Sequence, residues 1–247
     1  MSIFEQLENI RNNRGSVAVA LIDPDNKYDK ILYPMIELIN ESDFDIIFAG
    51  GSMVADSEFN NRIKFIKENT DLPLIIFPGS YNQISKYADA ILYLSLISGR
   101  NPQYLISDHV KSARLIHNLS LETISTAYIL LDGGMRSSVE LVSNTKPISM
   151  EKHDIILAHA LAGEYLGNKY IFLDAGSGAK HHITCEIISY LKSYITVPII
   201  VGGGINTVDS ASALVNSGAD YIVTGTQLEH LPNNHKLIQF TNSVHRA

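Results

Sequence analysis

The amino-acid sequence predicts a single-domain (β/α)8 (TIM) barrel over residues 1–247. Short apolar runs alternate with segments that carry apolar residues at helical spacing, and this alternation continues from one end of the chain to the other. No linker-like stretch or break in composition marks a domain boundary. Regular alternation over a chain of about 250 residues favours a closed barrel over an open, doubly wound sheet.

The composition is that of an ordinary globular protein. Apolar residues make up 45% of the chain, which is enough for a large core. The net charge of −7 and the lack of a Lys/Arg-rich stripe argue against a nucleic-acid-binding surface. The single cysteine, Cys185, cannot form an internal disulfide, and no apolar stretch is long enough to span a membrane. We therefore expect a cytoplasmic protein with no transmembrane segment, although peripheral contact with a membrane is compatible with this composition.

Each expected strand is a short apolar run that stops at glycine, proline, serine or aspartate. The clearest example is residues 197–201, where the run ends abruptly at Gly202, Gly203 and Gly204. The other expected strands lie at residues 16–22, 45–49, 74–77, 90–94, 123–131, 170–173 and 220–223.

The segments between these runs show helical periodicity. In residues 28–41, for example, Ile31, Leu32, Met35 and Ile36 recur at the spacing of one helix face. Residues 135–148 are polar and are expected to form a loop. Helices are expected at residues 3–12, 28–41, 57–69, 83–87, 102–119, 151–166, 183–194, 208–217 and 237–244.

Glycine-bearing turns follow strands six, seven and eight of the predicted barrel. Binding and catalytic groups of such barrels lie at the carboxyl ends of the strands, and phosphate sites recur near strands seven and eight. Converging backbone amides, with the hydroxyls of Ser177 and Thr226, form a donor-rich site for a phosphate that needs no Lys or Arg. The predicted phosphate site consists of Ala175-Gly176-Ser177-Gly178, Gly202-Gly203-Gly204 and Gly225-Thr226.

Asp23, Asp25 and Ser52 follow strands one and two at the same rim. A few carboxylate and hydroxyl oxygens suit Mg²⁺, which keeps several waters and shares its remaining positions with substrate phosphate. Asp-Pro-Asp is equally common as a strand-to-helix turn in which an aspartate caps the next helix. The residue pattern leaves both interpretations open.

Asp174 directly precedes the glycine turn of strand six. Because a phosphate would repel this carboxylate, Asp174 is expected to accept a hydrogen bond from a neutral hydroxyl of the same ligand, as a polyol phosphate would supply. That role extends to general base catalysis. A structural carboxylate that binds nearby backbone amides is the alternative.

The motifs, in their order along the chain, resemble those of the geranylgeranylglyceryl phosphate synthase family, which includes the bacterial heptaprenylglyceryl phosphate synthases. The match covers nearly the whole chain. Many phosphate-binding barrels share the glycine turns, but the combination of LIDPD, GGS, SGRNP and AGSGA is specific to this family. The resemblance rests on Leu21-Ile22-Asp23-Pro24-Asp25, Gly50-Gly51-Ser52, Ser98-Gly99-Arg100-Asn101-Pro102-Gln103-Tyr104, Thr126-Ala127-Tyr128, Phe172-Leu173-Asp174-Ala175-Gly176-Ser177-Gly178, Val201-Gly202-Gly203-Gly204-Ile205 and Gly225-Thr226.

This resemblance implies an Mg²⁺-dependent prenyltransferase of ether phospholipid biosynthesis that acts as a homo-oligomer. Such an enzyme joins sn-glycerol 1-phosphate to a polyprenyl diphosphate, for example geranylgeranyl diphosphate, and releases diphosphate. It implies Asp23 and Ser52 as magnesium ligands and a catalytic role for Asp174. The family's glycerol-phosphate positions fall on Phe172, Leu173, Asp174, Ala175, Gly176, Ser177, Gly178, Gly203, Gly204, Gly225 and Thr226.

Two positions depart from the family pattern. The family usually has glutamate where Asp174 stands, so this carboxylate is one methylene shorter. Leu21 stands where one branch of the family has a lysine for phosphate, which indicates membership in the other branch, with many archaeal and some bacterial enzymes.

A prenyl tail would need an apolar groove, for which Phe77, Leu94, Leu96 and Tyr128 are the candidates. Two alternative functions share the phosphate turns. The first is a sugar-phosphate isomerase or lyase, but such enzymes normally place a lysine or an acid/base pair at inner strand ends, and the expected strand ends hold no lysine. The second is a non-catalytic barrel that binds a phosphate ligand.

Overall fold

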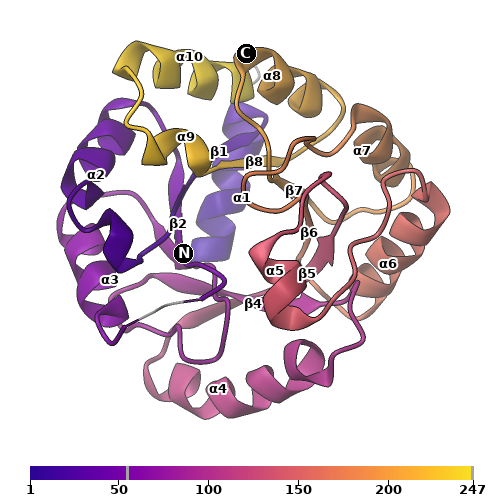
Figure 1. Cartoon of the computed structure of the whole chain (residues 1–247), viewed down its shortest axis with the longest axis horizontal. Coiled ribbons are helices and arrows are strands. Elements are labelled where there is room, and N and C mark those ends of the chain that lie inside the picture. Colours follow the sequence, from indigo (N-terminus) through magenta and orange to yellow (C-terminus); the bar gives the residue numbers. More distant parts are fainter. Residues whose placement is uncertain (54–55, 246–247) are drawn as a thin grey trace.

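A closed barrel of eight parallel strands forms the centre of the computed structural model, which describes residues 1–53 and 56–245. Each strand pairs with its neighbours in sequence order, and the last strand pairs with the first (Figure 1). The predicted TIM barrel is therefore confirmed. The strands are β1 (Val17–Ile22), β2 (Ile46–Ala49), β3 (Leu74–Ile76), β4 (Ala90–Leu96), β5 (Glu122–Leu130), β6 (Tyr170–Asp174), β7 (Ile199–Gly202) and β8 (Tyr221–Thr224).

Helices surround the barrel and connect its strands (Figure 1). Two short irregular helices occur as well, the 3₁₀ helix η1 (Asn26–Tyr28) and the π-helical segment η2 (Gln103–Ser107). The α-helices are α1 (Ile3–Arg14), α2 (Leu32–Glu41), α3 (Phe59–Glu68), α4 (Asp108–Asn118), α5 (Ser138–Ser143), α6 (His153–Tyr165), α7 (Cys185–Lys192), α8 (Val208–Asn216), α9 (Thr226–Glu229) and α10 (Asn234–Val244).

The strands bury both faces, and the alternation of side chains along each strand creates two apolar layers. In β6, Tyr170 and Phe172 belong to the layer inside the barrel, whereas Ile171 and Leu173 belong to the layer between strands and helices. Asp174 follows Phe172 by two residues and therefore points to the barrel interior at its open end.

The helix predicted at residues 83–87 is wrong, because this segment forms turns. Gln83 is buried and acts as a link between two loops at the barrel rim. Its side-chain nitrogen donates to the carbonyl of Gly51 at 2.7 Å, and its side-chain oxygen accepts from the amide of Gly79 at 3.1 Å. The buried amide side chain thus fixes the segment between β3 and β4 where a helix would otherwise lie.

The loop predicted at residues 135–148 is also partly wrong, since it contains α5. Ser137 caps this helix by accepting the Glu140 amide at 3.1 Å. A serine followed three residues later by glutamate is a helix-start signal, and it outweighs the polar character of the flanking residues.

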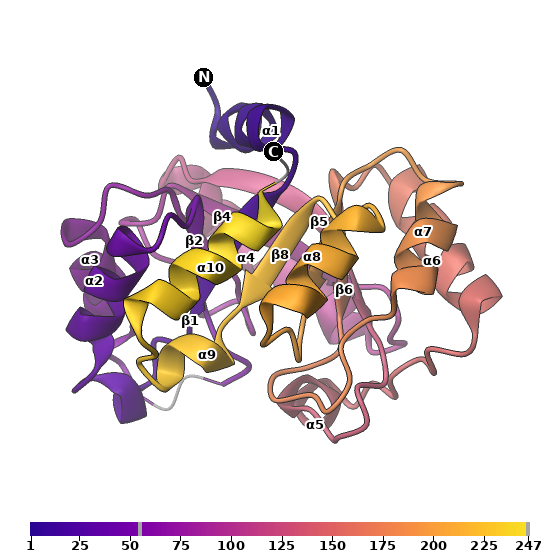
Figure 2. The same ribbon diagram turned by 90° about the horizontal axis from the view of Figure 1, so that it is seen from above.

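Helix α1 lies across one end of the barrel, and α5 and α9 lie at the other end (Figure 2). Leu7 of α1 is fully buried, and the amides of Ile3 and Phe4 donate to the Glu122 carboxylate at 2.6 and 2.9 Å. Helix α1 therefore closes the amino-terminal end of the strands.

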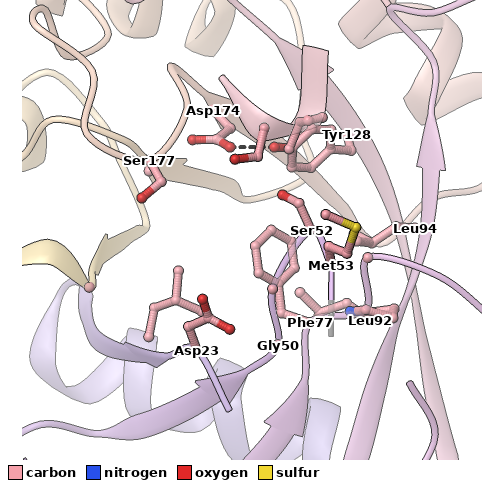
Figure 3. Close-up of a pocket in the computed structure, with 18 of the residues that line it drawn as sticks. Asp23, Gly50, Ser52, Met53, Phe77, Leu92, Leu94, Tyr128, Asp174 and Ser177 are labelled. Atoms are coloured by element: carbon pink, nitrogen blue, oxygen red, sulfur yellow. Dashed lines mark hydrogen bonds between the residues drawn. The ribbon is translucent and has the colours of Figure 1, made fainter. Parts of the chain in front are cut away.

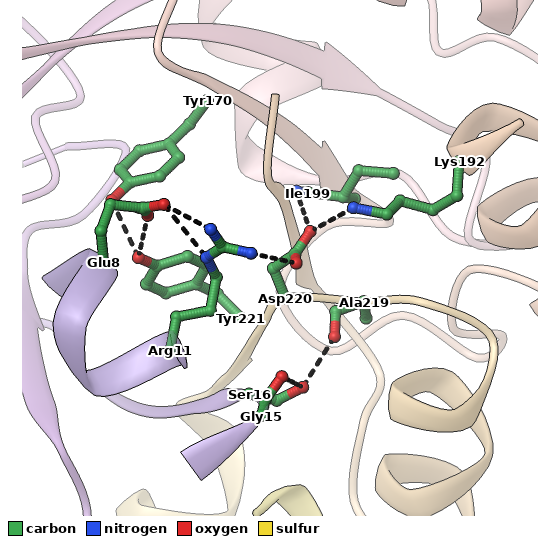
Figure 4. A network of polar contacts seen from close by, with 10 residues as sticks. All are labelled: Glu8, Arg11, Gly15, Ser16, Tyr170, Lys192, Ile199, Ala219, Asp220 and Tyr221. Atoms are coloured by element: carbon green, nitrogen blue, oxygen red, sulfur yellow. Dashed lines mark hydrogen bonds and ion pairs between the residues drawn. The ribbon is translucent and has the colours of Figure 1, made fainter. Parts of the chain in front are cut away.

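A polar network fastens α1 to the strands it covers (Figure 4). The Glu8 carboxylate accepts from the Tyr170 and Tyr221 hydroxyls at 3.2 and 2.9 Å and pairs with Arg11 at 2.7 Å. Arg11 also pairs with Asp220 at 3.3 Å. Burial raises the pKa values of both tyrosines, so both hydroxyls keep their protons and act as donors.

Along the described chain, no helix has both the length and the hydropathy that crossing a bilayer requires.

Candidate active site

The carboxyl ends of the strands open into a cavity of about 720 Å³ (Figure 3). Both predicted sites lie in this one cavity, because it is lined by residues from the proposed metal pair and from the glycine turns. The four candidates for an apolar groove, Phe77, Leu94, Leu96 and Tyr128, line it too. The predicted site residues that line the cavity are Asp23, Asp25, Ser52, Phe172, Asp174, Ser177, Gly202, Gly203, Gly204, Gly225 and Thr226.

The glycine turns after β6 and β7 lie directly against each other. Asp174 pairs with Gly202 in the strand register, which brings the two turns side by side. Gly203 has φ +87°, and a Cβ added there would come 2.8 Å from both the nitrogen and the oxygen of Gly176. Only glycine fits this position, both by backbone conformation and by space.

Several backbone amides in these turns remain free to bind a ligand. Within residues 1–53 and 56–245, the amides of Ser177, Gly178, Gly203, Gly204 and Thr226 donate to no protein acceptor. Thr226 is the first residue of α9, so its amide is also at a helix start. Unpaired amides that converge beside a cavity form an anion site without a positively charged side chain.

The other predicted residues of this segment shape the turn. Leu173 and Ala175 direct their side chains into the layer between strands and helices. The Ala175 amide donates to the Gly202 carbonyl at 3.1 Å, and the Gly176 amide donates to Asp174 Oδ1 at 2.9 Å. These two amides therefore hold the turn in place, while Gly178 contributes a free amide.

Asp174 is only 8% exposed, and both of its carboxylate oxygens accept a hydrogen bond. The Tyr128 hydroxyl donates to Oδ2, and the Gly176 amide donates to Oδ1. Burial raises the pKa of Asp174 above its usual range, although both hydrogen bonds oppose this shift. Burial and the neighbouring carboxylate raise the pKa of Tyr128 in turn. A buried acid with a raised pKa thus lies at the cavity wall, as general acid/base chemistry requires.

Asp23 lies on the opposite side of the cavity from Asp174 and Ser177 (Figure 3). Burial raises its pKa, Asp25 and Glu229 add to the shift, and Lys27 opposes it. In the described structure Oδ1 is buried and has no hydrogen-bond partner, whereas Oδ2 lies 3.3 Å from Lys27 Nζ. An unpartnered, buried carboxylate oxygen fits a cation, so the residues present are compatible with Mg²⁺.

The loop that carries Ser52 packs against Asp23. A Cβ added to Gly51 would come 2.4 Å from Asp23 Oδ1, so glycine is required for this close approach. No cluster of three or more His, Cys, Asp or Glu side chains suited to a metal occurs in the parts of the chain described. A cation here would therefore take its remaining ligands from substrate and water.

Asp25 has the structural role that the sequence pattern allowed. Its carboxylate caps η1 and accepts the Lys27 amide at 3.1 Å. Of the two interpretations of Asp-Pro-Asp, capping applies to Asp25, and Asp23 is left to face the cavity.

Arg62 connects the two loops of the candidate cation site. Its buried guanidinium donates to the two oxygens of Asp29 at 2.5 and 2.9 Å and to those of Asp56 at 2.7 and 2.8 Å, and it contacts the Pro24 carbonyl at 3.4 Å. These hydrogen bonds lower the pKa values of both carboxylates. Sequence reasoning missed Arg62, because Pro24 and Asp29 are more than 30 residues away along the chain and no motif links them to Arg62.

Aromatic and aliphatic side chains form the rest of the cavity. Phe77 stacks on Phe172 with ring centroids 5.1 Å apart and an interplanar angle of 18°. Val139 and Leu141 of α5 add apolar surface to the cavity, which was not expected because residues 135–148 were predicted to be a polar loop. The apolar groove is therefore wider than the four strand-end candidates indicate.

This fold and cavity define a class, the TIM barrels with glycine turns after strands six to eight, where phosphate sites of such barrels recur, here with an apolar groove beside these turns. Comparison with known proteins identifies the family within that class. Residues 8–243 match the PcrB family, and the chain belongs to it.

Relatives of known name support this assignment. The chain is 44% identical over 227 residues to geranylgeranylglyceryl phosphate synthase of Chitinophaga pinensis, which covers 92% of this chain and 89% of that protein. Identity to the synthase of Pyrococcus abyssi is 41% over 230 residues, covering 93% and 89%. The crystal structure of (S)-3-O-geranylgeranylglyceryl phosphate synthase from Thermoplasma acidophilum in complex with sn-glycerol-1-phosphate superposes with a TM-score of 0.92 at 35% identity, over 99% of both chains. The resemblance seen in the sequence is confirmed.

Proposed function

We propose that this protein is a prenyltransferase that joins sn-glycerol 1-phosphate to a polyprenyl diphosphate, such as geranylgeranyl diphosphate. The products are a prenylglyceryl phosphate ether and diphosphate. The observation that carries this proposal is a single cavity in which free backbone amides, a buried carboxylate and an apolar groove lie together. The names of the relatives point to the same reaction.

The glycine turns bind the acceptor by its phosphate. Free amides of Ser177, Gly203 and Thr226 lie at adjacent strand ends and suit a dianion. A phosphate held there directs the glycerol part toward the barrel centre, where the Asp174 carboxylate accepts a hydrogen bond from the free hydroxyl. This arrangement positions the nucleophile before the reaction begins.

Asp174 acts as the general base. The hydroxyl oxygen attacks C1 of the prenyl donor, the bond from C1 to the diphosphate oxygen breaks, and its electron pair leaves with the diphosphate. The hydroxyl proton passes to Asp174, whose raised pKa favours accepting it. The Tyr128 hydroxyl, hydrogen-bonded to Asp174, fixes the carboxylate in place.

Asp23 and Ser52 are the residues that would hold Mg²⁺. The unpartnered Asp23 Oδ1 supports this assignment. When bound, the ion supplies positive charge that stabilises the departing diphosphate. Arg62 keeps the two loops together, so that Asp23 and Ser52 face the same part of the cavity.

The apolar groove accommodates the prenyl tail. Stacked Phe77 and Phe172 form its start beside Asp174, and Leu94 and Leu141 extend it. A sugar-phosphate isomerase or a non-catalytic phosphate-binding barrel would use the glycine turns, but neither would need this groove. Cytoplasmic location, homo-oligomer formation and peripheral contact with a membrane stay predictions.

A radiolabel assay tests the proposal. The protein is incubated with labelled sn-glycerol 1-phosphate, Mg²⁺ and a panel of prenyl diphosphates, and butanol-extractable label is counted. We expect label in butanol only when both Mg²⁺ and a donor are present. Asp23→Asn should reduce turnover while the dissociation constant of glycerol phosphate stays close to that of the wild type. No extractable label with any donor would contradict the proposal.

A further inference from the structure

Lys27 is the only lysine or arginine that lines the cavity in the described part of the chain. Sequence reasoning missed it because it lies beyond the end of β1, in η1. The acidic residues that line the same cavity are more numerous, namely Asp23, Asp25, Asp108, Asp174 and Glu229. A negatively charged substrate that enters this cavity therefore meets one side-chain ammonium among several carboxylates.

The position of Lys27 is defined by its neighbours. Asp25 caps η1 through the Lys27 amide, which fixes the backbone from which the side chain extends. Lys27 Nζ lies 3.3 Å from Asp23 Oδ2 and 4.6 Å from the centre of the Tyr28 ring. The side chain is 58% exposed, so its ammonium remains accessible and has more donors than the Asp23 contact uses. The ammonium thus lies at the cavity wall beside Asp23.

The two anionic groups of the proposed reaction need different binding partners. The phosphate of the acceptor occupies the neutral amides after β6 to β8. The diphosphate of the donor carries more negative charge than the phosphate of the acceptor, and it gains further charge as the bond to C1 breaks. The carboxylates that line the cavity would repel this group. Positive charge beside Asp23 is therefore required, and Lys27 is placed to supply part of it.

We propose that Lys27 contacts the diphosphate of the prenyl donor and stabilises it as the leaving group, as a catalytic residue of this site. This inference rests on the proposed prenyl transfer. When the bond between C1 and the diphosphate oxygen breaks, the electron pair stays on the diphosphate, and Lys27 donates hydrogen bonds to its terminal oxygens. Lys27 keeps its proton throughout, because the proton released by the acceptor hydroxyl passes to Asp174.

In the free protein, the ion pair with Asp23 holds Lys27 at this wall. Binding of the donor replaces that partner with diphosphate oxygens. Asp23 Oδ2 would then be free to help hold a cation. Lys27 and Asp23 therefore act on the same group, the diphosphate of the prenyl donor, from neighbouring positions.

The test measures binding of inorganic diphosphate by isothermal titration calorimetry, once with Mg²⁺ and once with EDTA. Lys27→Met removes the charge and keeps the apolar stem, and Lys27→Arg keeps the charge. Lys30→Met is the matched control, since Lys30 is exposed and lies outside the cavity. The dissociation constant of sn-glycerol 1-phosphate and the KM for geranylgeranyl diphosphate are measured on the same variants.

We expect Lys27→Met to weaken diphosphate binding about tenfold in both buffers and to raise the KM of the donor by a similar factor. Glycerol phosphate binding should change by less than about twofold, Lys27→Arg should restore most of the diphosphate affinity, and Lys30→Met should match the wild type.

Unchanged diphosphate affinity in Lys27→Met would overturn the inference. A loss seen only with Mg²⁺ would overturn it as well, because Lys27 would then act through Asp23. A wild-type protein that forms no ether with any donor would contradict the proposed function instead, and the diphosphate affinity in EDTA would still decide the role of Lys27.

Discussion

At the scale of single residues, Asp174 combines burial with two hydrogen bonds and a raised pKa. As a general base it has to be ionised, so turnover should fall as the pH drops through this raised pKa. We expect the midpoint of this fall in turnover to lie at a pH above about 3.9, which is the usual pKa of aspartate. The measurement is kcat between pH 4 and 8 at saturating substrates.

Asp174→Asn, which is close to Asp174 in size, should reduce kcat by about 10² to 10⁴ and keep glycerol phosphate binding. The role as base would be wrong if this variant turned over like the wild type, or if kcat did not change with pH over the whole range.

Asp23 gives a prediction about stability at the same scale. Its raised pKa means that the folded protein binds this proton more tightly than the unfolded chain does. Ionisation of Asp23 at neutral pH therefore lowers the free energy of unfolding. Asp23→Asn should raise that free energy at pH 7, by less than about 1 kcal/mol because solvent and Lys27 screen the charge.

The gain from Asp23→Asn should disappear as the pH falls to about 3, below the usual aspartate pKa of about 3.9, because the wild-type carboxylate is then largely protonated in both the folded and the unfolded state. Urea denaturation at the two pH values measures it. If the variant were less stable than the wild type at pH 7, the ionised Asp23 would stabilise the fold. That result would contradict the prediction that its ionisation lowers the free energy of unfolding.

At the scale of elements, the turn after β7 depends on glycine for two separable reasons. Gly203 has a positive φ and also lies too close to Gly176 for a Cβ. Gly167 also has a positive φ of +82°, but a Cβ there would meet nothing within 4 Å. Gly167→Ala therefore isolates the cost of backbone strain, which is about 1 to 3 kcal/mol.

Gly203→Ala should destabilise the protein more than Gly167→Ala does, and it alone should weaken glycerol phosphate binding, by about tenfold or more because free amides move. Thermal unfolding and calorimetric titration provide the two readouts. Equal glycerol phosphate affinity in the two variants would contradict a phosphate site at this turn.

Two of the segments that sequence reasoning missed or misplaced have local physical causes. The turns at residues 77–89 are set by buried Gln83, which binds Gly79 of the same segment and also Gly51, on a loop that the pairing of β2 with β3 brings alongside. Helix α5 had a capping signal in Ser137 and Glu140, but a single turn and a half of helix produces little periodicity.

At the scale of the whole molecule, the two ends of the barrel have different tasks. The carboxyl end of the strands holds the cavity, and the amino end is closed by α1 through the Glu8 network (Figure 4). Glu8→Ala leaves the Tyr170 and Tyr221 hydroxyls and Arg11 without this carboxylate, so we expect a loss of about 2 kcal/mol in the free energy of unfolding.

Glu5→Ala on the same helix is the control, because Glu5 is exposed and should cost less than about 1 kcal/mol. Both variants should bind glycerol phosphate like the wild type. A change in that affinity for Glu8→Ala would show that the two ends of the barrel are coupled.

The sequence predicted the barrel and the strand-end residues because both follow from local patterns. Alternating strands and helices specify the barrel, and each motif marks where a strand stops. Contacts between side chains that are far apart in the sequence could not be predicted. The Tyr128 contact with Asp174 needs the register of β5 against β6, and the positions of Lys27 and Arg62 need the paths of the loops.

The central claim is that the acceptor hydroxyl attacks the prenyl carbon, and oxygen labelling tests it most directly. The protein is supplied with sn-glycerol 1-phosphate that carries ¹⁸O in the hydroxyl at C3, together with Mg²⁺ and geranylgeranyl diphosphate, and the products are analysed by mass spectrometry. The account predicts that all ¹⁸O is retained in the ether of the lipid product and that the released diphosphate is unlabelled. Recovery of ¹⁸O in a diphosphate or phosphate product, with no labelled ether, would contradict it.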